Sequence, residues 1–180
     1  MLDNIAPFKS NIDGQMYEVR EIGSPHEKQT AADYLAKIKG RVDELVLYMY
    51  ENELPDTDTS RRLFYRWSKC ELKETSSNES TAAYTLNKSE EIRLCIRKQD
   101  GSFENINTSM FVVLHELAHV MSVTYGHGEE FKRNFSYITH LASNLGIYKP
   151  ENFRENPVTY CGTEINTTPC DAGTCKYKIV

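Results

Sequence analysis

The stretch HELAHVMSVTYGHGEEF, residues 115 to 131, concentrates side chains that bind metals and transfer protons. It holds three of the five histidines in the 180-residue chain, together with three glutamates. His115 and His119 are four residues apart, and on a helix that spacing directs both imidazoles to one side. Two imidazoles so placed can bind one metal ion. Glu116 then lies beside the ion, where a carboxylate can accept a proton from water. The pattern predicts a metal centre with a general base.

A zinc ion needs at least one further protein ligand, and His127 is the best candidate. Glycines on both sides, Gly126 and Gly128, permit the sharp turn that would return the chain to the metal. Three other nearby side chains are alternatives: Glu129, Glu130 and His140. Three protein ligands leave the fourth tetrahedral position open, which is the arrangement of a catalytic zinc site. The competing interpretation is a pair of buried histidines in an ordinary core helix.

Hydrophobic periodicity predicts the elements that must position these residues. Apolar residues at spacings of three and four indicate helices, and alternation indicates strands. The predicted helices cover about residues 30–50, starting at Thr30 or Ser24, then 60–72, 107–120 and 129–145. The predicted strands cover 14–23 and two stretches within 83–98, joined by a tight turn around 87–90. The polar stretch 74–81 is predicted to be a mobile loop near the cleft.

This order of elements predicts an α+β fold. The length suits a single domain over residues 1–180, with a catalytic core at about 80–145 and a loop-rich tail at 149–180. Apolar residues make up 39% of the chain and charged residues 26%, as in globular proteins with a hydrophobic core. The net charge of −5 argues against a surface that binds nucleic acid through bulk electrostatics.

The first residues and the cysteines bear on the compartment. MLDNIAPFKS lacks the apolar core of a secretory signal, and the apolar runs are too short to cross a bilayer. The cysteines are odd in number, which favours free thiols in a reducing compartment. They are Cys70, Cys95, Cys161, Cys170 and Cys175. The last three have the spacing of a weak second metal site, with loose or paired thiols as the favoured alternative. We therefore expect an intracellular protein, cytoplasmic or nuclear, with no membrane partner.

Three motifs resemble the WLM (Wss-like) metalloproteases and the related SprT-like proteases. HELAH is followed by GHGEEF, in which a histidine precedes the next helix, and NKSEEIRLCIR, residues 87 to 97, precedes the catalytic helix. Metzincins do not fit, because seven residues separate His119 from His127 and the last methionine is Met121. The histidine spacing is a residue or two longer than is usual in WLM proteins. The chain also lacks the paired C-x-x-C units of a SprT zinc ribbon. The superfamily is therefore better defined than the subfamily.

The resemblance implies a zincin-like fold of the minimal gluzincin type, with the catalytic helix packed on a small sheet. It also implies one catalytic zinc ion and a protein or peptide substrate. The implied zinc ligands are His115, His119 and His127. Glu116 would take a proton from water and pass it to the leaving amine. A tyrosine hydroxyl would stabilise the oxyanion, and Tyr160 or Tyr125 could supply it.

Proteases of this architecture bind substrate as an extra strand on the edge of the sheet above the metal. We expect residues 92–97 to form that edge, with Arg93, Cys95 and Arg97 facing the cleft or the solvent. The alternative for the two arginines is that they only protect an exposed edge from aggregation.

The resemblance also implies that the substrates are proteins crosslinked to DNA. Residues 61–69, RRLFYRWSK, interleave arginines and aromatics, as a surface for single-stranded DNA can. At helical spacing, however, the same aromatics fit a buried core better. Two other functional classes stay open: a protein-binding module with a structural zinc, and a zinc hydrolase of a non-peptide substrate. Proteins of this type also occur in viruses, so a viral origin is compatible with the sequence.

Overall fold

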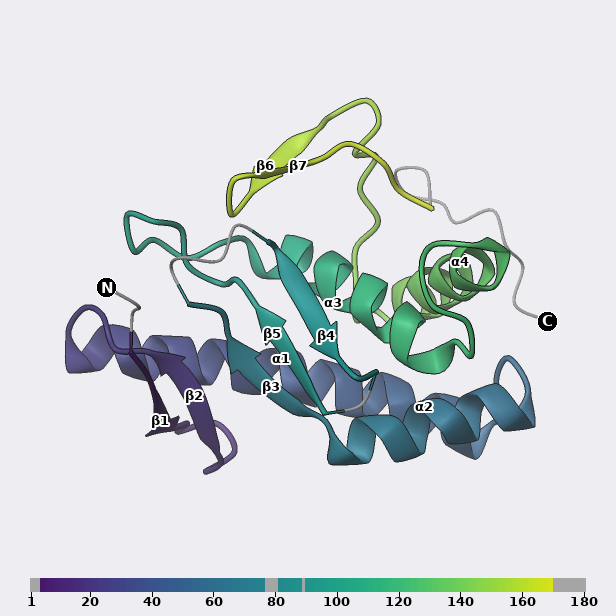
Figure 1. Ribbon diagram of the computed structural model, residues 1–180, viewed down its shortest axis with the longest axis horizontal. Helices are drawn as coiled ribbons and strands as arrows, with labels where there is room; N and C mark the ends of the chain where they lie inside the picture. The colour runs from purple at the N-terminus through teal and green to yellow at the C-terminus, as the bar shows by residue number, and fades with distance from the viewer. Residues whose placement is uncertain (1–3, 77–80, 89, 170–180) are drawn as a thin grey trace.

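Four helices and three small sheets make up residues 4–76, 81–88 and 90–169, the part of the chain that the computed structural model describes (Figure 1). The helices are α1 (Pro25–Glu51), α2 (Thr57–Lys69), α3 (Ile106–Met121) and α4 (Glu129–Asn144). The strands are β1 (Ile5–Lys9), β2 (Met16–Arg20), β3 (Glu71–Glu74), β4 (Ala83–Leu86), β5 (Glu91–Leu94), β6 (Val158–Tyr160) and β7 (Thr163–Ile165). The expected α+β class is confirmed.

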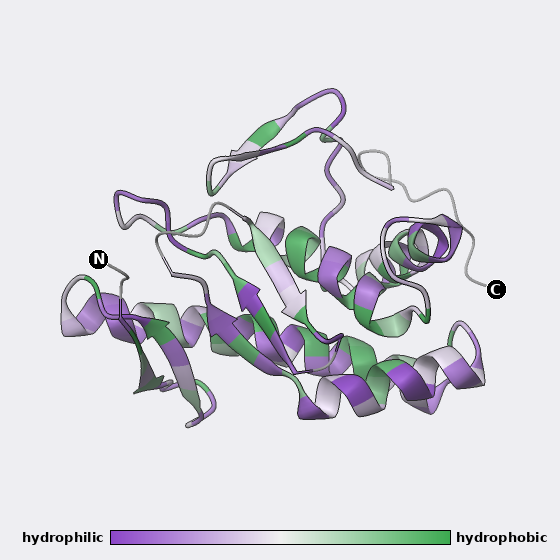
Figure 2. Ribbon diagram, in the orientation of Figure 1, coloured by the Kyte–Doolittle hydropathy of each residue, from purple (hydrophilic) through white to green (hydrophobic). Residues whose placement is uncertain are grey.

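The first two helices begin at side chains that cap them. The Ser24 hydroxyl accepts a hydrogen bond from the backbone N–H of Glu27, and the Glu27 carboxylate accepts one from the N–H of Ser24. Helix α1 therefore starts at Ser24 and not at Thr30, the other predicted start. Asp56 caps α2 by accepting from the N–H of Thr59. Polar and apolar residues recur along both helices (Figure 2), and the buried residues of each lie at helical spacing on one face.

Helix α3 lies in the middle of the fold. Asn105 caps it, and most of its residues are buried, because α1, α2, α4 and β4 all pack against it. A helix enclosed in this way has little freedom to shift, so the side chains that it carries keep a fixed relation to one another. The two predicted metal ligands on it lie in its last two turns.

The three-stranded sheet has the order β3-β5-β4. Strands β4 and β5 are antiparallel, and the turn between them includes Asn87 and Lys88 in left-handed backbone conformations. Strand β3 pairs with β5 in parallel. Strand β5 is therefore central, and the prediction that residues 92–97 form a substrate-binding edge is wrong. Alternation along a strand shows which face a side chain takes, but it does not show the order of strands in the sheet. The edge that packs against α3 is β4.

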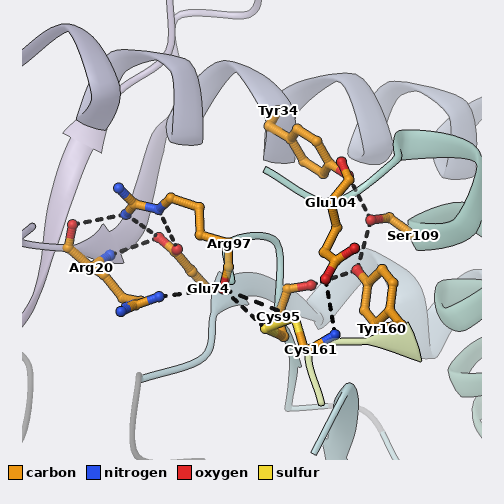
Figure 3. Close-up of a disulfide and its surroundings, with 9 residues drawn as sticks. All are labelled: Arg20, Tyr34, Glu74, Cys95, Arg97, Glu104, Ser109, Tyr160 and Cys161. Carbon is orange, nitrogen blue, oxygen red and sulfur yellow. Dashed lines mark hydrogen bonds and ion pairs between the residues drawn. A yellow bond between two sulfur atoms is a disulfide. The ribbon is translucent and has the colours of Figure 1, made fainter. Parts of the chain in front are cut away.

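The prediction that Arg97 faces the cleft or the solvent is also wrong. Its side chain and that of Glu74 are each 1% exposed and form an ion pair, with Nε of Arg97 2.7 Å from Oε1 of Glu74 (Figure 3). Glu74 is the last residue of β3 and not part of a loop. Residues 77–80 of the predicted mobile loop lie outside the described residues. Arg93 lies on the central strand and pairs with Glu91, so its place in the sheet does not support a role in substrate binding. That role stays a prediction.

Cys95 and Cys161 form a disulfide that joins the chain just after β5 to the turn of the β6–β7 hairpin (Figure 3). The expectation of free thiols is wrong for these two residues, and a buried, bridged Cys95 does not face a substrate. Cys161 has a φ of 46° and Gly162 a φ of 78°, the backbone pattern of a tight hairpin turn. Cys70 is a free, half-buried thiol, while Cys170 and Cys175 lie outside the described residues.

A continuous hydrophobic cluster includes side chains from all four helices and from β5. Within residues 4–76, 81–88 and 90–169, no helix is both long and apolar enough to span a membrane. The single-domain assignment to residues 1–180 stays a prediction, because both chain ends lie outside the described ranges.

Loss of the disulfide is expected to destabilise the protein. The bridge closes a loop of 66 residues, and the loop-entropy relation then gives a loss of about 4 kcal/mol in the free energy of unfolding. Thermal unfolding of wild type and Cys161→Ser, each with and without a dithiol reductant, measures the effect. Reductant should lower the wild-type midpoint toward that of Cys161→Ser and leave the variant nearly unchanged.

The matched control is Cys70→Ser, which removes a thiol outside the bridge and should keep the sensitivity to reductant. A wild-type midpoint that does not respond to reductant, with no crosslinked peptide containing Cys95 and Cys161 in a non-reducing digest, would contradict the bridge.

Candidate metal centre

Three histidines from two segments of the chain meet at one point. His115 and His119 lie on successive turns of α3, and His127 lies just before α4. One ligand nitrogen from each lies within 4.8 Å of those of the other two. The Nε2 atoms of His119 and His127 are 3.0 Å apart. The two helix histidines are half-buried and His127 is exposed. The structure thus brings together the three ligands that the sequence predicts.

Phe131, in the first turn of α4, packs among the three imidazoles. Its ring centroid is 4.3 Å from that of His119, 4.7 Å from that of His127 and 4.9 Å from that of His115. Phe131 is itself buried. An apolar ring in this position limits how the imidazoles can rotate and offers no competing ligand, so it helps to keep the three nitrogen atoms converged.

Cationic side chains from other elements bind the carbonyl oxygens at the carboxyl end of α3. The last carbonyls of a helix have no partner within it. Arg62 and Arg66 of α2 donate to the carbonyl oxygens of residues 120–122. Lys88, in the turn after β4, donates to two carbonyl oxygens of residues 122–124. These contacts fix the point at which the chain leaves the helix and turns back toward the histidines.

Glu130 holds the other side of that turn. Its carboxylate accepts hydrogen bonds from the N–H groups of Val123 and Thr124 and from the Thr124 hydroxyl, at 2.6 to 3.0 Å. Its limited burial alone would raise the pKa of Glu130, but these hydrogen bonds and the charge of Arg62 lower the pKa to about 2. Glu130 therefore closes the loop that carries His127 and is not free to serve as a metal ligand.

Glu116 is buried beside His115. Its Oε2 accepts a hydrogen bond of 2.6 Å from the hydroxyl of Thr85 on β4, and its Oε1 lies 3.3 Å from Nδ1 of His115. Burial alone would raise the pKa of Glu116. The hydrogen bonds from His115 and Thr85 and the potential of the nearby histidines outweigh that effect and lower the pKa below its ordinary value. The predicted base is thus a carboxylate at neutral pH.

The environment keeps His119 uncharged. Burial, together with the neighbouring His115 and His127, lowers the pKa of His119 to about 4, although Glu116 opposes the shift. A neutral imidazole has a lone pair available for a metal, whereas a protonated one does not.

The geometry fits a zinc ion. Zinc binds imidazole nitrogen at about 2.0–2.1 Å, so the ligand nitrogens of a tetrahedral site lie about 3.4 Å apart. The observed separations of 3.0 Å for His119 and His127, and of no more than 4.8 Å within the set, come close to this value. Three imidazole nitrogens next to a carboxylate that is not itself part of the set match the donors of catalytic zinc sites.

The structure contradicts the role predicted for Tyr160. Its side chain is completely buried, and its hydroxyl bonds Ser109 and the carbonyl oxygen of Cys95 (Figure 3). Burial raises the pKa of Tyr160 well above its ordinary value. Its hydroxyl therefore ties the C-terminal hairpin to the core. Tyr125, the alternative, is 81% exposed, and its ring lies 4.4 Å from Nζ of Lys88.

The other predicted alternatives do not join the histidine set. His140 is buried on α4, and Glu129 is exposed and contacts Lys132 at 3.8 Å. Thr85 and Lys88 support the site but were not singled out by sequence reasoning. Phe131 was part of the GHGEEF motif, four residues after His127 at the start of a helix. No local signal marks Thr85, since its role depends on how β4 packs against α3.

The fold and the site define an α+β protein with a three-histidine centre and an adjacent buried carboxylate. The chain is 33% identical over 162 residues to uncharacterized protein R325 of Acanthamoeba polyphaga mimivirus, an alignment that covers 88% of this chain and 81% of that protein. The chain therefore belongs to the same family as mimivirus R325. No family model matches the chain.

Two further viral proteins resemble part of the chain. Uncharacterized protein 136R of Invertebrate iridescent virus 6 is 35% identical over 80 residues, covering 43% of this chain and 44% of that protein. Uncharacterized protein 042R of Invertebrate iridescent virus 3 is 41% identical over 73 residues, covering 40% and 45%. These two alignments span less than half of either relative. All three relatives are viral, in agreement with the expectation that proteins of this type occur in viruses.

Among solved structures, the chain resembles the crystal structure of Wss1 from Saccharomyces cerevisiae. The match covers 66% of this chain and 84% of that chain, with 20% identity and a TM-score of 0.48. A TM-score below 0.5 does not establish a shared fold.

Removal of the third histidine should weaken zinc binding. His127→Ala deletes one of three ligands, so we expect a loss of affinity larger than the roughly 10–100-fold that follows loss of an outer-shell partner. Competition with a chromophoric chelator measures the affinity. His26→Ala is the matched control, because His26 is an exposed histidine at the start of α1. Equal zinc affinity in His127→Ala and wild type would exclude His127 as a ligand.

Glu130→Gln should destabilise the protein in a pH-dependent manner. The pKa of Glu130 is lowered from 4.5 to about 2 in the folded protein. Its carboxylate therefore stabilises the fold above pH 4.5, and this contribution is lost as the pH falls toward 2. The nearby charges are Arg62 and Arg66 on α2 and Lys88 after β4, all cationic over this range.

Thermal unfolding of wild type and Glu130→Gln between pH 7 and pH 3 tests this expectation. The midpoint difference should be greatest at pH 7 and shrink below pH 4.5. The matched control Glu129→Gln alters a neighbouring glutamate with a 91% exposed side chain and should change little. A midpoint difference that is independent of pH would argue against the titration of Glu130.

Proposed function

We propose that the protein is a zinc-dependent endopeptidase with a zincin-like fold, of the kind found in WLM and SprT-like proteases. One observation carries most of the weight: three imidazoles converge on one point of α3 and its following loop, with a buried carboxylate directly beside them. The HELAH and GHGEEF motifs add to it, because the residues that match the family pattern are those that meet in space.

In this proposal, the metal ion and the side chains of the protein carry out different parts of the reaction. A bound zinc ion polarises a carbonyl oxygen and lowers the pKa of water. Glu116 takes a proton from the attacking water and passes it to the leaving amine nitrogen. The partial burial of His115 and His119 and the close packing of Phe131 keep the ligands aligned during both transfers. The proposal assigns the oxyanion donor to Tyr125, which is exposed and lies two residues before His127.

The substrate of the proposed enzyme is an extended polypeptide bound along β4. In the described part of the chain, β4 pairs with β5 on one side and with no strand on the other, and it packs against α3. A peptide strand added there would bond through its main chain, which permits many sequences. This edge replaces residues 92–97 of the sequence-based prediction.

A role for DNA has weaker support. In the stretch 61–69, Arg62 and Arg66 are engaged with the end of α3, and Trp67 is buried with its indole N–H bonded to Asp43. Arg61, Tyr65 and Lys69 are the exposed basic or aromatic residues that remain. We therefore include single-stranded DNA in the proteolysis assay, to measure whether it stimulates cleavage.

Glu116→Gln should abolish proteolysis and keep the metal. Loss of a general base costs about a hundredfold to ten-thousandfold in rate, whereas the change from carboxylate to amide leaves the three histidines in place. Cleavage of unfolded β-casein by zinc-loaded wild type and Glu116→Gln, with zinc content measured on the same samples, tests this. Parallel assays with single-stranded DNA and with a nitrophenyl ester address DNA dependence and non-peptide substrates.

Zinc in both proteins with cleavage only by wild type would support the peptidase. Zinc in both with cleavage of neither substrate would indicate a structural site in a binding module. Ester hydrolysis that depends on Glu116, without proteolysis, would indicate a hydrolase of another class.

A further inference from the structure

We propose that Thr85 is a positioning residue for the general base, and that it couples the base to the strand on which substrate binds. This inference rests on the proposed function. Thr85 is far from the histidine motif in sequence, and its hydroxyl reaches Glu116 from a different element, at 2.6 Å.

The two oxygens of Glu116 have different environments. Oε2 is engaged by the Thr85 hydroxyl at 2.6 Å, a short bond to a charged acceptor. Oε1 has the longer contact, 3.3 Å to Nδ1 of His115. Because the bond at Oε2 is the shorter of the two, Oε1 would be the oxygen that accepts the proton from water. Thr85 therefore determines which oxygen reacts and how the carboxylate plane is turned.

The backbone of Thr85 is itself well fixed. Thr85 lies opposite Ile92 in the β4–β5 ladder, and Ile92 is completely buried. Successive side chains of a strand point to opposite faces, so Thr85 reaches α3 while Tyr84 and Leu86 project to the other face. Among the described strands, none pairs with the outer edge of β4.

The same strand thus has two tasks in the proposed enzyme. Its main chain binds the substrate strand, and its Thr85 side chain orients the base that acts on that substrate. A peptide paired with β4 would therefore lie on the same strand whose Thr85 hydroxyl holds the Glu116 carboxylate. Loss of the hydroxyl should therefore reduce kcat much more than it alters KM, because the peptide-binding edge is unchanged.

Thr85→Val removes the hydroxyl at nearly constant shape, and Thr85→Ser retains it. We expect Thr85→Val to lower kcat for β-casein by about 10- to 100-fold, the range seen when an outer-shell partner is lost. KM and zinc affinity should stay near the wild-type values, and Thr85→Ser should restore most of kcat. Thr159→Val, at an exposed threonine of β6, is the matched control for a threonine in a strand.

A double-mutant cycle in thermal unfolding tests the contact without any activity measurement. Thr85→Val and Glu116→Ala should be non-additive, since each removes one partner of the same hydrogen bond. Strictly additive effects would overturn the proposal, as would a wild-type kcat in Thr85→Val or a failure of Thr85→Ser to restore kcat. Cleavage lost in Glu116→Gln but unchanged in Thr85→Val overturns the role of Thr85 alone. Cleavage indifferent to Glu116→Gln overturns the proposed function itself.

Discussion

The buried ion pair between Arg97 and Glu74 holds the β1–β2 sheet and the three-stranded sheet together. The Glu74 carboxylate accepts two bonds from the Arg97 guanidinium and one from the N–H of Arg20, and Arg97 also donates to the carbonyls of Arg20 and Ile22. A buried pair is tolerated when its hydrogen-bonding groups are satisfied in this way, and removal of one partner typically costs about 3–5 kcal/mol. These bonds join the first hairpin to the ends of β3 and β5. Because β5 carries β4, they also support the strand from which Thr85 reaches the base.

A second constraint acts at the carboxyl end of α3, where the chain must leave a buried helix and return toward it within a few residues. Carbonyl oxygens exposed by the end of the helix need donors, and these come from α2 and from the turn after β4. Glu130 satisfies the opposite set of groups, the N–H groups of the loop. Cationic side chains therefore bind the carbonyl oxygens of this turn, and the Glu130 carboxylate binds its N–H groups. These contacts, and not a helix, determine where His127 lies.

Much of the local structure could be predicted from the sequence. The helices follow from apolar spacing, and the capping residue Ser24 and the turn at 87–90 were recognisable by residue type. The three histidines and Glu116 were found because the spacing within one helix is a local property, and glycines mark the turn before α4. The failures share another cause. Three features depend on tertiary packing: the order of the strands, the burial of Arg97 against Glu74, and the pairing of Cys95 with a residue 66 positions away. Tyr160 was misassigned because eleven tyrosines offered no means of choosing between the core and the cleft.

The disulfide also changes the covalent topology of the chain. It closes residues 95–161 into a ring, and that ring contains α3, α4 and all three histidines of the metal centre. A single peptide-bond cut anywhere inside the ring would leave both fragments attached while the bridge persists. Self-cleavage within this region would thus be invisible on a non-reducing gel, and a nicked molecule would keep the two halves of its metal centre tethered. Among the described residues outside the ring, no second disulfide gives such protection, so one cut there separates the two parts.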